Sequence, residues 1–162
     1  AGDIYLGFES MVEITLLSIL IGGLAALIKA AGGLDWLAQV IATFARGRTG
    51  RRSGEISIAA LAAGSDALTA NNTVAILVTG SLARDIAQRH GISPRRAASV
   101  LDIFACVVQG VLPYGAQILL AASLAAVSPL ALAGSVQYCW LLAVSALAFM
   151  LWPSRRKVPA AE

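Results

Sequence analysis

Long apolar stretches alternate with short polar or basic ones along the whole sequence. Residues 11–31, "MVEITLLSILIGGLAALIKAA", carry an acid near one end and a lysine near the other, with no charge between. A helix needs about 20 apolar residues to cross a hydrocarbon core about 30 Å thick. Residues 11–31 therefore predict a transmembrane helix.

The next segment, residues 34–45, reads "LDWLAQVIATFA" and places its apolar side chains at steps of three and four, with Trp36 near its start. This spacing predicts a helix with one apolar face. The segment is too short to cross a membrane, so we expect it to lie along the membrane interface.

Residues 55–84 contain a polar stretch, "SDALTANNT", between two apolar halves of about 13 and 10 residues. Two full transmembrane helices would need about 40 residues. We therefore predict a re-entrant helical hairpin that turns at "TANN", near the middle of the membrane. Non-helical backbone at that depth must be buried in protein or line a polar cavity.

Residues 97–127 are long for a single crossing and are interrupted by "GVLPYG". Pro113 removes a backbone donor and clashes with the preceding turn, which predicts one broken transmembrane helix. Residues 132–152 predict a further transmembrane helix that ends at Trp152. The expected fold is an all-α integral membrane domain spanning residues 1–162.

Composition supports a membrane setting, since 58% of the residues are hydrophobic, 13% are charged and the mean hydropathy is +0.78. Soluble domains have roughly 45 to 50% apolar residues. The net charge of +3 comes from basic clusters at residues 46–52, 89–96 and 155–157, which lie beside apolar segments without interleaved aromatics. This pattern argues against nucleic-acid binding and predicts that the basic loops and the C-terminus lie in the cytoplasm. We expect the protein to be a multi-pass protein of the inner membrane.

Candidate ion ligands gather at the predicted hairpin tip. Oxygen atoms of Asp66, Thr69, Asn71 and Asn72, with backbone carbonyls after Leu68, suit a small hard cation. Asp66, Asn71 and Asn72 are the expected Na⁺ ligands. The second half of the hairpin begins near a further candidate, Thr73, and the N-terminus of that half-helix is able to face an anionic group instead.

A polar stripe runs along the predicted broken helix at steps of three and four. It consists of Ser99, Asp102, Cys106 and Gln109. A carboxylate within a membrane helix costs a few kcal/mol, so Asp102 should face protein or water. We expect Asp66 and Asp102 to exchange protons for a cation.

The helix break itself supplies further candidates for the substrate path. They are Gln109, Pro113 and Tyr114. Simpler roles remain open for the polar residues, since those of the tip can cap helix ends and Asp102 can pair with Arg95 or Arg96 at the interface. The sequence has no nucleophile–base pair, metal signature or phosphate loop, so neither an enzyme nor a cofactor is expected.

Residues 69–116 resemble the C-terminal part of the NhaC-type sodium/proton antiporter family. The resemblance rests on an apolar segment ending in Gly80 to Asp85, then "GISP" at 91–94, "SVLD" at 99–102 and "LPY" at 112–114. It implies a secondary carrier built from hairpins and broken helices, in which this chain is one half of an inverted repeat. The other half would come from the same polypeptide or from a partner subunit, and a homodimer is possible.

The resemblance implies exchange of Na⁺ for protons across the cytoplasmic membrane. The turn reads "TANNT", however, where many members of the family carry an acidic–aromatic pair. A proton- or sodium-coupled carrier of a small organic anion or amino acid is therefore the alternative. A membrane scaffold without transport is the third reading, and it requires the polar turn to be fully satisfied by neighbouring backbone.

Overall fold

A computed structural model describes residues 2–45 and 50–152. Within these residues the chain forms eight α-helices. They are α1 (Gly2–Ala30), α2 (Gly33–Ala45), α3 (Arg51–Thr69), α4 (Asn72–Arg89), α5 (Pro94–Val111), α6 (Ala116–Ala125), α7 (Pro129–Ser135) and α8 (Gln137–Leu151). Most of the first basic cluster and all of the third lie outside the described residues.

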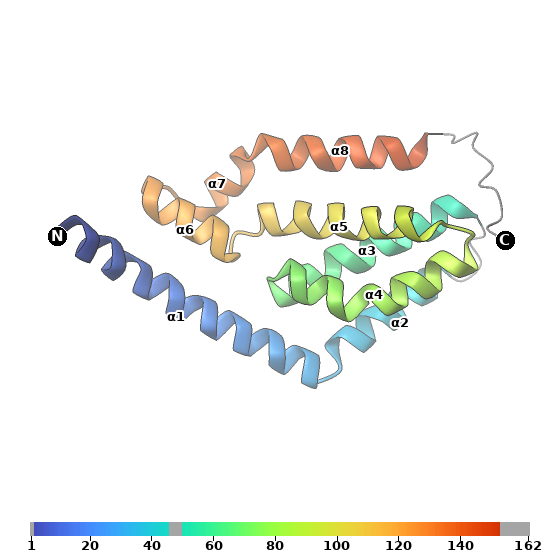
Figure 1. The fold of residues 1–162 in the computed structure, drawn as a ribbon, viewed down its shortest axis with the longest axis horizontal. Coiled ribbons are helices and arrows are strands. Elements are labelled where there is room, and N and C mark those ends of the chain that lie inside the picture. The colour runs from blue at the N-terminus through green and yellow to red at the C-terminus, as the bar shows by residue number, and fades with distance from the viewer. Residues whose placement is uncertain (1, 46–49, 153–162) are drawn as a thin grey trace.

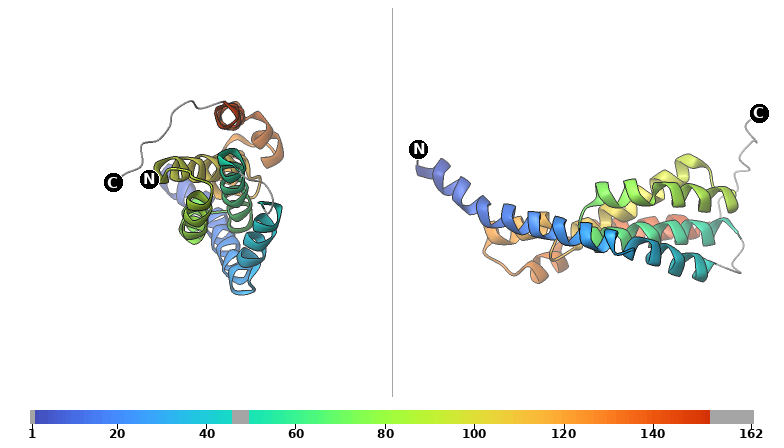
Figure 2. Two further views of the ribbon diagram at one scale, coloured as in Figure 1. Left: turned by 90° about the vertical axis from the view of Figure 1, so that its right-hand side faces the viewer. Right: turned by 90° about the horizontal axis from the view of Figure 1, so that it is seen from below.

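Helix α3 is the centre of the bundle and packs against α1, α2, α4, α5 and α8. Figure 1 shows α5 beside it, and the end-on view in Figure 2 shows α4, α5 and α2 grouped around it. The fully buried positions include Ile58, Leu61, Ala62 and Ala105. Small residues at such contacts allow helix backbones to approach closely.

The predicted hairpin corresponds to α3 and α4, which are joined by Ala70 and Asn71. Its arms have 19 and 18 residues, or about 28 and 27 Å. Both arms are longer than the predicted apolar halves of about 13 and 10 residues. The polar residues on both sides of the apolar halves are also helical, because the glycines that bound the two helices lie beyond them. Gly50 and Gly91 have φ of 121° and 63°, which favour glycine and stop a helix.

The predicted broken helix corresponds to α5 and α6. Leu112 and Gly115 are extended, with ψ of 114° and 141°, and the helix resumes at Ala116. Taken as one element, Pro94–Ala125 is the single described helix long and apolar enough to cross a membrane. The number rises to three if two bent pairs, α1 with α2 and α7 with α8, each count as one span.

The end of the chain differs from the expected single helix over residues 132–152. Val136 leaves helical geometry, with φ −75° and ψ 75°, and the chain bends by 49° between α7 and α8. The indole N–H of Trp140 donates to the Ala133 carbonyl at 3.2 Å, which satisfies an acceptor near the bend. Helix α1 also differs, since it begins at Gly2 rather than at residue 11.

Large apolar side chains are exposed along α1 and α8, at opposite sides of the bundle in Figure 1. Exposed apolar surface of this extent marks contact with lipid or with further protein. On α1 the exposed side chains include Leu16, Ile19, Leu20, Leu24 and Leu27, and on α8 they include Leu141, Val144, Phe149 and Leu151.

A buried ion-pair cluster joins the beginnings of α3 and α5. Glu55 is only 1% exposed, and its Oε1 accepts from Arg51 Nε at 2.9 Å and from Arg96 Nε at 3.1 Å. Arg96 Nη2 donates to the second oxygen, Oε2, at 3.1 Å. The Arg96 guanidinium also lies 4.5 Å from the ring centroid of Phe149, which brings α8 into the same cluster.

Candidate ion-binding site

The hairpin tip is a two-residue interruption between α3 and α4. Ala70 adopts the left-handed conformation, with φ 49° and ψ 29°, and its N–H donates to the Asp66 carbonyl at 2.7 Å. Asn71 caps α4, because its Oδ1 accepts from the N–H of Val74 at 3.1 Å. The carbonyls of the last turn of α3 therefore point beyond the helix end, with their partial negative charge.

The tip lies beside the break between α5 and α6 (Figure 1). Side chains from the end of α5 and from the break donate hydrogen bonds to the tip's backbone. The hydroxyl of Tyr114 donates to the Ala67 carbonyl at 2.6 Å. Gln109 Nε2 donates to the Ala70 carbonyl at 3.3 Å and to Oε1 of Gln117 on α6 at 2.7 Å. Two helix interruptions that are distant in sequence thus meet in one place.

Asp66 is the most unusual residue at this meeting point. It is fully buried, and neither of its carboxylate oxygens has a hydrogen-bond partner among the described residues. The same holds for the hydroxyl of Ser65 and for Oε1 of Gln109, within the same described ranges. Four buried oxygen atoms of three residues are left without a donor, although burying a polar group without a partner is costly.

The other predicted tip residues have local partners. The hydroxyl of Thr69 donates to the Ser65 carbonyl at 2.9 Å and is also 3.2 Å from the carbonyl oxygen of Asn71. Thr73 is exposed, and its hydroxyl lies 3.4 Å from Oδ1 of Asn72. The side chain of Asn71 caps α4, as described above. The tip's unpartnered oxygens therefore come from Ser65 and Asp66 rather than from the asparagines.

Asp102 lies on α5 and is exposed. The thiol of Cys106 approaches its Oδ1 at 3.9 Å, and Asn72 Nδ2 approaches the same sulfur at 3.7 Å. Asp102 is thus linked to the tip only through Cys106 and Asn72, and no hydrogen bond joins it to Asp66 in the described part of the chain. Arg96, one of its expected partners, pairs with Glu55 instead.

The predicted polar stripe on α5 therefore divides into two parts. Ser99 is exposed, like Asp102 and Cys106, whereas Gln109 is 8% exposed and turns toward the tip. Pro113 lies in the break and is half-buried, next to Tyr114. Gln109, the end of the stripe nearest the break, is thus the part that is buried where the two interruptions meet, while Cys106 contacts Asn72 at the exposed edge.

Comparison with known families decides the class of protein. The model of the Na+/H+ antiporter family matches residues 2–152, nearly the whole chain.

The chain belongs to the Na+/H+ antiporter family.

This is a family of membrane transporters that exchange a cation for protons and not a class of enzymes. Membership agrees with the all-helical fold and with the exposed apolar helices of this antiporter chain. No curated protein and no solved structure matches the chain significantly.

Two residues of the antiporter's meeting point escaped the sequence reasoning. Ser65 belongs to the polar stretch at 65–73, for which helix capping is the simpler role that the sequence suggests, and Gln117, which holds Gln109 in place, lies outside every predicted site. A signal for Gln117 exists, because it is the one polar residue in the first turn of the apolar α6. The ion pair between Glu55 and Arg96 was also missed, since its partners are 41 residues apart.

Proposed function

We propose that this chain is the C-terminal repeat of an NhaC-type antiporter that exchanges Na⁺ for protons across the cytoplasmic membrane. Asp66 is the group that carries the ion in one state and the proton in another. The basic loops and the C-terminus face the cytoplasm. A second, inverted repeat, from the same polypeptide or from a partner subunit, completes the transport path.

The observation that carries this proposal is the fully buried carboxylate of Asp66 without a partner in the described residues. An isolated buried carboxylate is strongly disfavoured, so it must be neutralised by a proton or by a cation. Both neutralise the same oxygen atoms and therefore compete. Competition at one carboxylate is the minimum chemistry that exchange of Na⁺ for protons requires.

The surroundings of Asp66 favour a cation over other ligands. Asp66 lies in the last turn of α3, where the carbonyl ends of the helix carry partial negative charge. The unpartnered oxygens of Ser65 and Gln109 are neutral, hard donors of the kind that Na⁺ prefers. We assign Asp66 as the principal ligand, with Ser65 and Gln109 in support. Asn71 and Asn72, with Thr69 and Thr73, shape the turn around it.

Asp102 receives a different role in this proposal. Its exposure on α5, and its connection to the tip through Cys106 and Asn72, suit a carboxylate on the route to the site. Cations and protons would pass Asp102 before they reach Asp66. The polar face that carries Ser99 and Asp102 is then the side that the second repeat covers.

Reconstituted vesicles test the assignment directly. The intact protein is placed in proteoliposomes that contain a pH-sensitive dye, and a Na⁺ gradient drives proton movement. Asp66→Asn should abolish the Na⁺-dependent pH change, while Asp102→Asn should reduce it. Asp85→Asn, an exposed acid near the end of α4, is the matched control and should leave exchange unchanged.

Normal exchange by Asp66→Asn would refute the assignment, as would an equal loss in Asp85→Asn. The alternative, a carrier of a small organic anion, needs free N–H groups at the N-terminus of α4. Asn71 already occupies one of these groups, the N–H of Val74, which leaves fewer of them for an anion. Stabilisation of the purified protein by amino acids rather than by Na⁺ would reverse this preference.

A further inference from the structure

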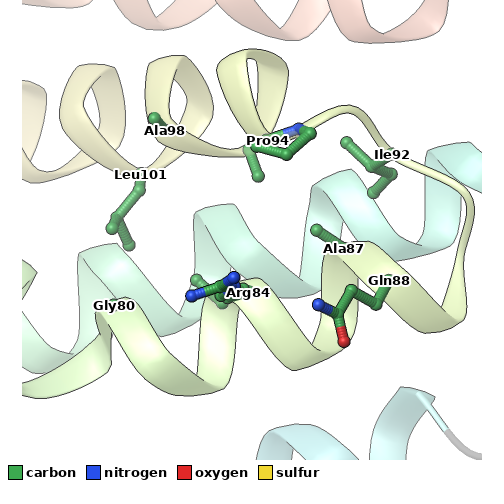
Figure 3. Close-up of a pocket in the computed structure, with 10 residues that line it drawn as sticks. Gly80, Arg84, Ala87, Gln88, Ile92, Pro94, Ala98 and Leu101 are labelled. Atoms are coloured by element: carbon green, nitrogen blue, oxygen red, sulfur yellow. The ribbon is translucent and has the colours of Figure 1, made fainter. Parts of the chain in front are cut away.

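A groove separates α4 from α5 at the end of the bundle away from the hairpin tip. Its volume is about 460 Å³, within the range of about 300 to 1,000 Å³ typical of small-molecule sites. Figure 3 shows side chains of both helices and of the connecting loop facing it. It is lined by Gly80, Ala83, Arg84, Ala87, Gln88, Ile92, Pro94, Ala97, Ala98 and Leu101.

The walls of this groove are apolar except at one place. Eight of the ten lining residues are glycine, alanine, proline, isoleucine or leucine, and the two exceptions are Arg84 and Gln88. These two lie one turn apart on α4, and both are exposed. The groove therefore combines an apolar floor with one cation and one amide at its edge.

The charge of Arg84 is available to a ligand. No ion pair involves Arg84 in the part of the chain that the structure describes, and Asp85, its neighbour in sequence, does not pair with it there. Arg51 and Arg96 are different, because both bind Glu55. Arg84 is therefore a cation beside an apolar groove, with no counter-charge among the described residues.

We propose that the groove between α4 and α5 binds an anionic phospholipid, with the lipid phosphate on Arg84 and Gln88 and an acyl chain along the apolar floor. Membership of a membrane transporter family places the chain in a bilayer, so phospholipid is available as a ligand. Guanidinium groups form strong, directional hydrogen bonds to phosphate. Basic pockets between membrane helices are recurrent sites for acidic lipid head groups.

Charge and shape together favour a lipid over other occupants. A free phosphate ion would use Arg84 but would gain nothing from the floor formed by Ala83, Ala97 and Leu101. A helix of another protein would cover the floor but would have to desolvate Arg84. An anionic lipid satisfies both features, since its head group remains at the wet edge while its tail covers the apolar surface.

Retention of lipid by the purified intact protein, measured by native mass spectrometry, tests the proposal. Dioleoylphosphatidylglycerol should be retained more strongly than dioleoylphosphatidylcholine, which has the same tails and no net charge, and inorganic phosphate should not compete. Arg84→Gln should weaken retention of phosphatidylglycerol about fivefold, the effect of one basic residue near a lipid surface. Arg89→Gln is the matched control, because Arg89 is exposed on α4 but does not line the groove.

A second variant tests the floor independently of charge. A Cβ added at Gly80 meets nothing within 4 Å, so there is space for Gly80→Leu to place a larger side chain in the groove that Gly80 lines. It should reduce retention of phosphatidylglycerol and leave Na⁺ exchange intact. Equal losses in Arg84→Gln and Arg89→Gln would overturn the proposal by showing diffuse surface charge. Equal retention of the two lipids would also overturn the proposal. So would the absence of any retained lipid, which would indicate that another part of the protein covers the groove.

Discussion

Helix α3 carries two buried carboxylates with opposite surroundings. Glu55 and Asp66 are eleven residues apart, about 16 Å along the helix and on nearly the same face. Glu55 accepts hydrogen bonds from two guanidinium groups, Arg51 and Arg96. Asp66, equally buried, accepts none within residues 2–45 and 50–152.

The comparison separates Glu55, whose ion pairs hold helices together, from Asp66, whose carboxylate oxygens have no partner in the described residues and can bind a proton or a cation. A buried charge with complete partners is neutralised permanently, so it is fixed in one state. A buried carboxylate without partners must take its neutralising group from outside, and perturbed groups of this kind cluster at functional sites. Within one helix, the pattern of hydrogen bonds therefore distinguishes a structural acid, Glu55, from Asp66, the acid to which we assign the ion.

The largest expected effect on stability comes from breaking the structural acid. Glu55→Gln leaves the guanidinium groups of Arg51 and Arg96 without their counter-charge. Because both groups keep some access to solvent, this should cost about 1.5 to 3 kcal/mol of unfolding free energy, the range for hydrogen bonds to charged groups. Exchange per folded molecule should persist, because the variant lies about 16 Å from the ion site. Thermal unfolding in detergent, with exchange normalised to folded protein, checks both. A loss of exchange without a loss of stability would show that Glu55 is not a purely structural acid.

Asp66→Asn should behave in the opposite way. Without added sodium the variant should be as stable as the parent protein, because no hydrogen bond to the carboxylate is lost. The parent should gain about 1.4 kcal/mol in sodium at ten times its Kd, and the variant should gain nothing. Thermal unfolding across a sodium series, with Asp85→Asn as control, measures this. Stabilisation of Asp66→Asn by sodium would move the ion site elsewhere.

A smaller effect is expected from the contact between the break and the tip. Tyr114→Phe removes the hydroxyl that donates to the Ala67 carbonyl, which should cost about 1 kcal/mol and slow exchange without abolishing it. Tyr138→Phe is the control, since Tyr138 is exposed on α8. Initial rates of exchange and unfolding temperatures compare the two. Identical behaviour of both variants would mean that the contact does not help to position the tip.

The smallest expected effect concerns the backbone of the tip. Ala70 is left-handed, a conformation that costs a residue with a side chain about 1 to 2 kcal/mol and glycine little. Ala70→Gly should therefore stabilise the protein by up to about 1 kcal/mol, after the extra freedom of glycine in the unfolded chain is subtracted. Ala126, left-handed at the end of α6, is the matched control outside the site. Destabilisation by Ala70→Gly alone would show that rigidity of the tip matters more than strain.

The sequence signalled the two interruptions because their causes are local. Polar residues inside an apolar segment marked the turn at Ala70 and Asn71, and Pro113 marked the end of α5. The bend at Val136 has no proline, and its indole contact joins residues seven apart, so the apolar pattern of residues 132–152 did not reveal it. A helix interruption can therefore be predicted from sequence where a helix-breaking or polar residue marks it.

The candidate site was less accessible to sequence reasoning. Periodicity placed Asp102 and Gln109 on one stripe of α5, but it gives no information on what each part of the stripe meets. The structure buries Gln109 at the tip and leaves Asp102 exposed. The pairing of Glu55 with Arg96 likewise depends on how α3 docks on α5, which no local pattern encodes.

The contacts from Tyr114 and Gln109 end on main-chain oxygens, those of Ala67 and Ala70. Every amino acid has the same backbone carbonyl, so these two fastening hydrogen bonds do not depend on which side chains positions 67 and 70 carry. The fastening would therefore persist if the side chain of Ala67 or Ala70 were exchanged for another one. Substitutions at these two positions can change the volume or polarity around the tip and still leave the junction with the break in place.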